Sequence, residues 1–323
     1  MKQPFNPTPK GLTLLEIVDY FPTDDKAREH LESMTWPNGP ACPHCGTNDQ
    51  DRISKVAANP EKKVRAGLYC CKDCRKQFTV TVNTIFADTH IPLRKWLIAW
   101  YLLCASKKGV SSLQIQRMLD LGSYKSALFM MHRIRYALQD PVFTDPLKGV
   151  VEIDETYVGG KTKGMGAHYM GNKTPVVSLV ERGGNKRSFA FDNERVTGKN
   201  INKVVAEHVH GTATVNTDES LLYSRVKRTH KHASVNHSKE EYVRMDGEDV
   251  VTTNTVESSF SLLKRGVVGT FHNISKKHLP LYLSEFDHRW NTRHDSDTER
   301  TNKGLRKVRG KRITYAPLTK SSK

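Results

Sequence analysis

The chain has 323 residues, with 51 Lys and Arg against 34 Asp and Glu, so its formal net charge at pH 7 is +17. This positive excess favours a polyanionic partner, nucleic acid before an acidic membrane surface. The longest apolar run, residues 97–105, is far shorter than the roughly 20 residues of a bilayer-spanning helix, and residues 1–10 lack an apolar signal-peptide core. We therefore expect a cytoplasmic protein without a membrane partner, in which six cysteines bind metal more readily than they form disulfides.

Residues 1–35 are expected to form a short helical lead-in. Residues 13–21 give one apolar helical stretch. Thr23 is suited to cap a second helix, because two acids follow it in the first turn. The sequence "WPNGP" then ends the helical pattern.

Two CxxC pairs follow within residues 36–90, a segment with the pattern of a zinc ribbon. Each pair places two thiolates on a tight turn, and four thiolates complete a tetrahedral zinc site. Cys70 is an alternative to Cys71, although only Cys71 has the two-residue spacing to the last cysteine. Cys104 lies in an apolar helical stretch and is expected in the core. The expected ligands of one structural Zn²⁺ are Cys42, Cys45, Cys71 and Cys74.

Residues 77–86 alternate like a pair of strands that leaves the ribbon, and the period then becomes helical over residues 91–140. The expected helices cover residues 93–109, 111–121 and 123–138. The short turn before the last of them is typical of a helix-turn-helix, whereas a helical hairpin that only packs fits the pattern equally well. The net charge and the neighbouring ribbon favour DNA binding. Candidate contacts on the last helix are Lys125, His132, Arg133 and Arg135.

A Pro-rich linker, residues 140–149, marks the main domain boundary, and a mixed pattern follows over residues 147–295. Antiparallel strand signals give way to alternating strands and helices, which predicts a mixed α/β sheet. A glycine-rich basic loop is expected over residues 161–173. Strands are expected over residues 149–160, 174–182, 187–196 and 213–219, and helices over residues 199–209, 254–266 and 276–293.

Three acids in this region stand where a site centred on a sheet would need them. Asp154 follows the apolar residues of one strand, Asp218 ends another, and Glu257 lies one turn into a helix. Three converging carboxylates repel one another unless they hold divalent cations, and Mg²⁺ prefers such oxygen ligands. Two ions roughly 3.5–4 Å apart would serve phosphoryl chemistry. Periodicity alone does not separate these acids from Glu152, on the same strand face as Asp154, or from the nearby Glu155 and Glu219.

Basic residues accompany these acids. Lys264 follows Glu257 by seven residues, nearly on the same helical face, where it could meet a phosphate. His278, Tyr282, Arg289 and Arg293 recur at helical spacing further on. The full set of candidate DNA contacts is Lys125, Arg133, Lys264, Arg265, Arg289 and Arg293.

The C-terminal segment, residues 296–323, is read as a basic tail. It carries nine Lys and Arg from Arg300 onward, with no acid among them, and few apolar residues. We expect such a segment to be extended along the surface or disordered until it meets DNA.

From about Leu12 to Tyr315 the chain resembles the DDE transposases of bacterial insertion sequences, in the ISXO-like group with an N-terminal zinc ribbon. The resemblance rests on the stretches "WPNGPACPHCG", "YCCKDCRKQFTVTVNTIF", "THIPLRKWLIAWYLL", "VEIDETYVGGK", "TDES" and "NTVESSFSLLKRGVVGTFHNISKKHLPLYLSEFDHRWNTR". It implies an RNase H-like catalytic domain with Asp154, Asp218 and Glu257 as catalytic acids. The family often has Gly where this chain has Asn83, from which we expect a local change of the turn.

The resemblance implies a transposase that binds the terminal inverted repeats of its element, cleaves to expose a 3′-OH and joins it to target DNA. It further implies two Mg²⁺ or Mn²⁺ per active site, with Asp154 bridging both, and a homodimer or higher assembly on double-stranded DNA. Two rivals stay open. One is an RNase H-like nuclease without strand transfer, and the other is a zinc-ribbon DNA-binding regulator with an inactive catalytic domain.

Overall fold

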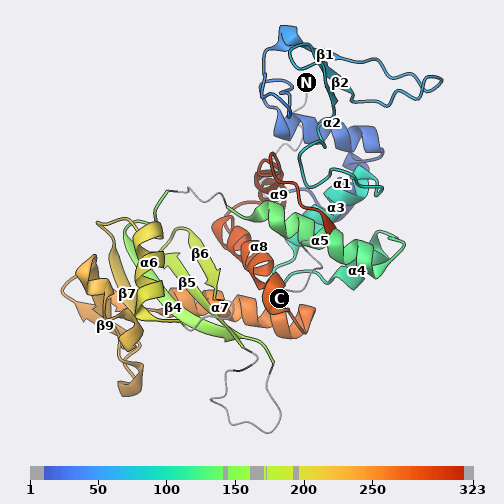
Figure 1. The fold of residues 1–323 in the computed structure, drawn as a ribbon. Helices are drawn as coiled ribbons and strands as arrows, with labels where there is room; N and C mark the ends of the chain where they lie inside the picture. The colour runs from blue at the N-terminus through green and yellow to red at the C-terminus, as the bar shows by residue number, and fades with distance from the viewer. Residues whose placement is uncertain (1–10, 141–144, 161–170, 172, 192–195, 316–323) are drawn as a thin grey trace. The chain divides into compact units, whose positions relative to one another are not determined.

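The computed structural model describes residues 11–140, 145–160, 171, 173–191 and 196–315. The chain divides into two compact units (Figure 1). Unit 1 combines Met1–Gln139 with Thr292–Lys323, and unit 2 is Asp140–Asn291. The first boundary falls at the start of the segment expected as a linker. No helix in the described part of the chain has the length and apolar character that a bilayer crossing requires.

Unit 1 begins with two capped helices and a three-stranded ribbon. Helix α1 (Leu14–Tyr20) follows Thr13 in a capping box, and α2 (Asp24–Thr35) follows the cap Thr23, as the sequence indicates. The 3-10 turn η1 (Gln50–Arg52) leads into the strands. These strands pair antiparallel in the order β1-β2-β3 and comprise β1 (Ile53–Lys55), β2 (Tyr69–Cys71) and β3 (Gln77–Phe78).

The expected strand pair over residues 77–86 is wrong, because only Gln77–Phe78 is a strand. Beyond it the chain turns repeatedly, since the hydroxyl of Thr84 donates to the carbonyl of Thr81 at 2.7 Å and competes with ladder pairing. Asn83 adopts a φ of 57°. This is the left-handed region that glycine favours and that asparagine tolerates best among other residues. The turn therefore has a conformation that glycine also favours.

Helix α3 (Leu93–Ala105) is the centre of the unit 1 core, with nine consecutive buried residues from Trp96 to Cys104. A helix that is apolar on all sides must be surrounded by other elements. It ends at Ala105, several residues before the expected Gly109. The helical hairpin α4 (Ser112–Met118) and α5 (Tyr124–Leu138) follows, with Ser111 and Ser123 as caps.

The expectation of an extended or disordered basic tail is wrong for residues 297–308. Helix α9 (Asp297–Leu305) packs against α3, and both Leu305 and Val308 are fully buried in the same core. Gly304 permits this approach, because a Cβ there would lie 2.8 Å from Nε1 of Trp100. Residues 316–323 lie outside the described part of the chain.

Unit 2 contains one five-stranded mixed sheet in the order β6-β5-β4-β7-β8. Strand β4 pairs antiparallel with β5, and β5 with β6, whereas β4–β7 and β7–β8 are parallel. This confirms the mixed α/β sheet and agrees with the RNase H-like fold. The strands are β4 (Val150–Val158), β5 (Thr174–Glu181), β6 (Lys186–Ala190), β7 (Thr214–Thr217) and β8 (Lys231–Ser234).

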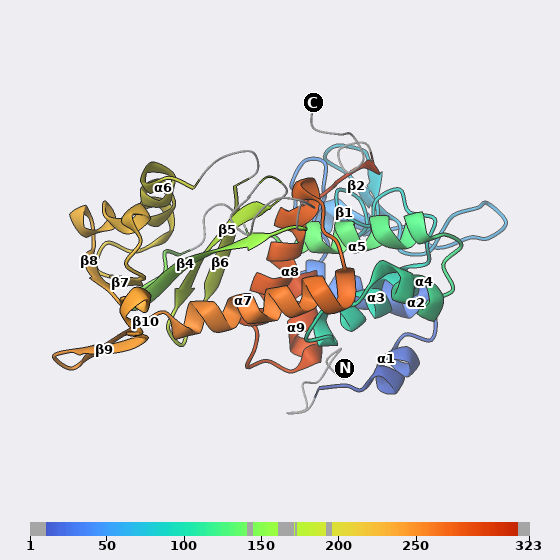
Figure 2. The ribbon, with the colours of Figure 1, turned by 90° about the horizontal axis from the view of Figure 1, so that it is seen from below.

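Helices cover both faces of this sheet (Figures 1 and 2). Helix α6 (Gly198–His208) packs on one face with Val151 and Ile153. Helices α7 (Asn254–Gly266) and α8 (Leu279–Asn291) pack on the other with Val158.

Because side chains alternate along a strand, Glu152 and Asp154 point toward the α7 face and Glu155 toward the α6 face.

The remaining elements of unit 2 are the hairpin β9 (Val243–Asp246) and β10 (Asp249–Thr252), the π-helix Val267–Phe271, and 3-10 turns at Leu221–Tyr223, Val226–Arg228, His237–Lys239 and Lys276–His278.

The packing of α9 generates a stability prediction. Replacing Leu305 with alanine should lower the free energy of unfolding of unit 1 by about 2–5 kcal/mol, because it leaves a cavity beside α3. Replacing Leu15, which is 76% exposed in the same unit, should change it by less than about 0.5 kcal/mol. Chemical denaturation of both variants measures the difference. Equal stabilities would contradict the packed position of α9.

Candidate functional site

Two of the expected catalytic acids lie side by side on the central strands of unit 2. The parallel register of β4 and β7 pairs Glu152 with Asn216. Two residues further along each strand, Asp154 and Asp218 therefore lie level with each other on the same face of the sheet. Asp218 stands just beyond Thr217, the last residue of β7. The strand order thus brings together two acids that are 64 positions apart in the chain.

Asp154 is the most perturbed of these acids. Burial, aided by the charges of Glu155, Asp218 and Glu257, raises the pKa of Asp154 to about 7. The backbone N–H of Glu155 opposes this rise by donating to Asp154 Oδ1 at 2.7 Å. The charges of Asp218 and Glu257 therefore repel that of Asp154, and a bound cation would relieve this repulsion.

Asp218 and Glu257 complete the group. Burial raises the pKa of Asp218 as well, and the charges of Glu219 and Glu257 raise it further. The hydrogen bond from the Ser220 N–H and the charge of His237 lower it. Glu257, in the first turn of α7, accepts a hydrogen bond from the Thr253 hydroxyl at 2.9 Å. Its Oε1 lies 3.7 Å from Nε2 of His237. No periodic signal in the sequence pointed to His237, which lies in the loop between β8 and β9.

The donor set of this group fits a divalent cation of the Mg²⁺ type. All three acids offer hard carboxylate oxygens, and two of them are held partly buried with raised pKa values. Among the described residues, one carboxylate oxygen from each of these three acids cannot be chosen so that all lie within 4.8 Å of one another. The charges of Asp218 and Glu257 act on Asp154, but a cation shared by all three acids would have to draw their oxygens closer together.

The structure separates the alternative acids from this group. Glu152 shares the face of Asp154 but is fully buried, with its carboxylate occupied by Arg182 and the start of α7. Glu155 faces the other side of the sheet and accepts a hydrogen bond from the Tyr223 hydroxyl.

Glu219 holds the nearby loop instead. It accepts the backbone N–H groups of His237 and Ser238 at 2.9 and 3.0 Å. The Ser238 hydroxyl and these N–H groups lower the pKa of Glu219 to about 2. Geometry thus favours Asp154, Asp218 and Glu257, a choice that spacing alone left open.

The four cysteines of unit 1 form a ready zinc site. Their Sγ atoms all lie within 4.8 Å of one another, with 3.6 Å between Cys42 and Cys74 and between Cys45 and Cys71. Thiolates at about 2.3 Å from a tetrahedral Zn²⁺ stand about 3.8 Å apart, which fits this cluster. The residue after each pair, Gly46 or Arg75, has a positive φ, so both pairs form the same tight turn.

The two remaining cysteines take no part in this cluster. Cys70 is the middle residue of β2, paired between Ser54 and Gln77, and points away from its neighbour Cys71. Cys104 is fully buried in α3, as expected. The structure therefore supports one structural Zn²⁺ on the four expected ligands.

Two of the expected DNA contacts, Arg133 and Arg289, are buried. Arg133 is 4% exposed, donates to the carbonyl of Ala87 at 2.7 Å and stacks on Trp96. Arg289 is 8% exposed and pairs with Glu285. His132 and Arg135 of α5 are buried too. Basic residues on a helix cover a core as readily as they meet a phosphate, because their long stems are apolar. Lys125, Lys264 and Arg265 are exposed, and Arg293 is partly exposed.

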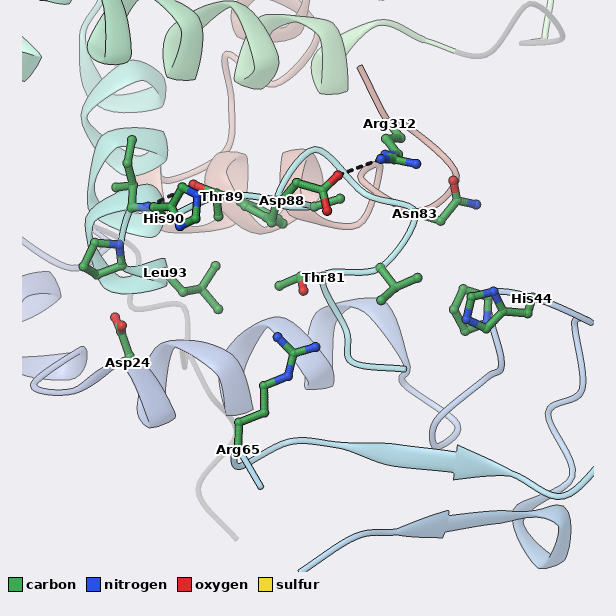
Figure 3. A pocket seen from close by; sticks show the side chains of 16 residues that line it. Asp24, His44, Arg65, Thr81, Asn83, Asp88, Thr89, His90, Leu93 and Arg312 are labelled. Carbon is green, nitrogen blue, oxygen red and sulfur yellow. Dashed lines mark hydrogen bonds and ion pairs between the residues drawn. The ribbon is translucent and has the colours of Figure 1, made fainter. Parts of the chain in front are cut away.

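The zinc ribbon of unit 1 also carries exposed cations. A cavity of about 680 Å³ lies between the first zinc turn, the ribbon hairpin and residues 81–93 (Figure 3). His44 and the exposed Arg65 line it, while Arg312 pairs with Asp88 on its rim at 2.6 Å. The exposed ribbon cations are Arg52, Lys55, Lys62, Lys63, Arg65, Lys72, Arg75 and Lys76.

Comparisons with known proteins match both regions. Residues 146–291 match the family model of the ISXO2-like transposase domain, and residues 22–77 match that of the transposase zinc-ribbon domain. The chain is also 29% identical over 287 residues to an uncharacterized protein in the transposable element ISH50 of Halobacterium salinarum, a match that covers 83% of this chain and 91% of the relative. The matched regions contain the three acids and the four cysteines.

The cysteine cluster predicts the zinc content of variants. Cys42→Ser or Cys74→Ser should lose the bound zinc and unfold the ribbon, because structural zinc supplies folding free energy directly. Cys70→Ser and Cys104→Ser should each retain one zinc per chain, as the parent does. Metal analysis of the purified proteins measures this. Zinc loss from the Cys70 variant would contradict the ligand assignment.

The raised pKa of Asp154 predicts a pH effect in the metal-free protein. Its pKa is about 7 in the folded protein against the ordinary value of 3.8 for an aspartate, so the folded state binds the proton more tightly. The stability of unit 2 should therefore fall as the pH rises from about 4 to about 7, by about 1.4 kcal/mol for each pKa unit. Asp154→Asn should flatten this dependence and raise stability at pH 8. Thermal unfolding at pH 5 and pH 8 tests it, and an unchanged slope in the variant would refute the perturbation.

Proposed function

The chain belongs to the ISXO2-like transposases, and from that premise we propose that it cleaves DNA at the ends of its element and joins the exposed 3′-OH to a target strand. The observation that carries the proposal is the placement of Asp154 and Asp218 on neighbouring central strands, with Glu257 in the first turn of α7. Phosphodiester transfer needs carboxylates grouped in this way and little other covalent chemistry from the protein.

In this proposal the three acids hold two Mg²⁺ or Mn²⁺ ions. Asp154, whose pKa is raised by burial and by the charges of Asp218 and Glu257, would be the ligand that both ions share. When bound, the ions would activate the attacking oxygen and stabilise the leaving oxygen of the phosphodiester. Thr253 orients Glu257 through its hydroxyl. Lys264 is exposed on α7, two turns after Glu257, where its ammonium can contact a phosphate next to the acids.

The DNA partner in this proposal is double-stranded, comprising the terminal inverted repeats and the target. The exposed cations of the zinc ribbon support a role of unit 1 in holding the phosphate backbone. Because an element has two ends, we propose that at least two copies of the chain act together on the DNA. The buried basic face of α5 argues against this helix as the main DNA contact.

The acids yield the central mutational prediction. Asp154→Ala, Asp218→Ala and Glu257→Ala should each lower cleavage and joining at least about 100-fold, because charge stabilisation in the transition state is lost. Binding of the element end should stay largely intact. The measurement uses a labelled duplex with the DNA end that flanks the gene, in Mg²⁺, on a denaturing gel. Glu248→Ala, in the exposed turn between β9 and β10, is the control and should retain activity.

The products of the same experiment separate the rival functions. Cleavage without a joined strand would favour a nuclease over a transposase. Binding without metal-dependent cleavage by the parent protein would favour a DNA-binding regulator. Full activity of the Glu257 variant would mean that the third acid is misassigned.

A further inference from the structure

Glu152 is an unusual residue to bury in a sheet. It is fully buried near the start of β4, yet the hydrogen-bond partners of its carboxylate come from other elements. Its Oε2 accepts the backbone N–H groups of Thr255 and Val256 at 2.7 and 3.1 Å. Its Oε1 accepts the Thr255 hydroxyl at 2.9 Å, and Nε and Nη2 of Arg182 at 3.0 and 2.9 Å. One carboxylate thus binds five donors.

Arg182 ties this carboxylate to its surroundings. The residue directly follows β5, and its backbone N–H donates to the carbonyl of Val150 on β4 at 2.9 Å. Its Nη1 donates to the carbonyl of Val250 on β10 at 2.9 Å. The guanidinium therefore joins the hairpin that precedes α7 to the strand that carries Asp154. Its planar fork suits such bidentate contacts better than an ammonium group.

The start of α7 lacks the usual local cap. Thr253 stands at the cap position, but its side chain makes no capping hydrogen bond to the helix. Its hydroxyl donates to Glu257 instead. The first N–H groups of a helix need acceptors, and a negative charge there is favoured by the helix dipole. Glu152, from a strand about a hundred residues earlier in the chain, supplies both.

We infer that Glu152, held by Arg182, is a positioning residue that sets Glu257 against Asp154. Glu152 lies two residues before Asp154 on the same strand face, and Val256 directly precedes Glu257. A single carboxylate thus fixes the strand that carries the first acid and the helix that carries the third. The inference rests on the proposed function, because it assigns a role toward the divalent cations of that site.

A purely stabilising role makes a different prediction. Replacing a buried ion pair with neutral groups changes stability, but leaves the affinity of a distant metal site alone. A residue that orients metal ligands changes the metal affinity itself, and such supporting partners are typically worth about 10–100-fold. Mn²⁺ affinity is therefore the measurement that separates the two roles.

The test compares Glu152→Gln with Glu285→Gln. The glutamine at position 152 keeps the shape of the side chain but weakens its contacts with Arg182 and α7. Glu285 is the matched control, since it is also fully buried in unit 2 and pairs with Arg289 on α8. The Mn²⁺ dissociation constant is measured on the full chain from the electron paramagnetic resonance signal of free Mn²⁺. Cleavage of the element end is followed as a function of Mg²⁺.

We expect Glu152→Gln to raise the Mn²⁺ dissociation constant and the Mg²⁺ concentration for half-maximal cleavage by about 10-fold or more. High Mg²⁺ should restore much of the rate. Glu285→Gln should leave both values unchanged. If Glu152→Gln does not fold, Arg182→Lys replaces it in the test. The Arg182 side chain is 31% exposed, so this substitution should destabilise the protein less. It should shift both values in the same direction.

Three outcomes decide the matter. Unchanged Mn²⁺ affinity in the folded variants of Glu152 or Arg182, with an active parent, overturns the inference. An equal shift in Glu285→Gln overturns it too, because the effect would then follow from lost stability. A parent protein that neither binds Mn²⁺ at the acids nor cleaves DNA defeats the proposed function itself.

Discussion

The repulsion among carboxylates on the central strands of unit 2 is the constraint on which the rest of the structure depends. The charge of each acid of β4 is compensated in a different way. Glu152 is neutralised by Arg182 and the start of α7, and Glu155 is bound by the Tyr223 hydroxyl. Asp154 accepts a backbone N–H, and its pKa is raised to about 7. Asp154 is therefore the acid of β4 whose charge is least compensated, which supports the proposal that it shares a cation with Asp218 and Glu257.

Local signals in the sequence predicted much of this fold. Thr13 and Thr23 begin helices because their hydroxyls satisfy free N–H groups, and the paired cysteines define a zinc turn by spacing alone. Periodicity also predicted a mixed sheet. It did not separate Glu152 from Asp154, since both occupy one face of one strand. Their different roles depend on partners 30 and 103 positions away in the chain.

Burial of basic residues was the main feature that sequence reasoning missed. Charge alone placed Arg133 and the C-terminal segment on DNA, yet Arg133 covers Trp96 and the segment packs through Leu305 and Val308. In both cases a few apolar contacts outweigh the local charge pattern, because burial of one large apolar side chain contributes about 1.5–3 kcal/mol. The cations of the zinc ribbon remain exposed, and under the proposed function they are the residues that contact DNA instead.

Anomalous diffraction from crystals soaked in Mn²⁺ tests the central claim most directly. We expect a manganese peak shared by the carboxylates of Asp154 and Asp218, and a second peak shared by Asp154 and Glu257 when the end of the element is bound. Zinc at the four cysteines provides an internal reference in the same crystal. A zinc signal at the cysteines with no manganese at these three acids would contradict the account.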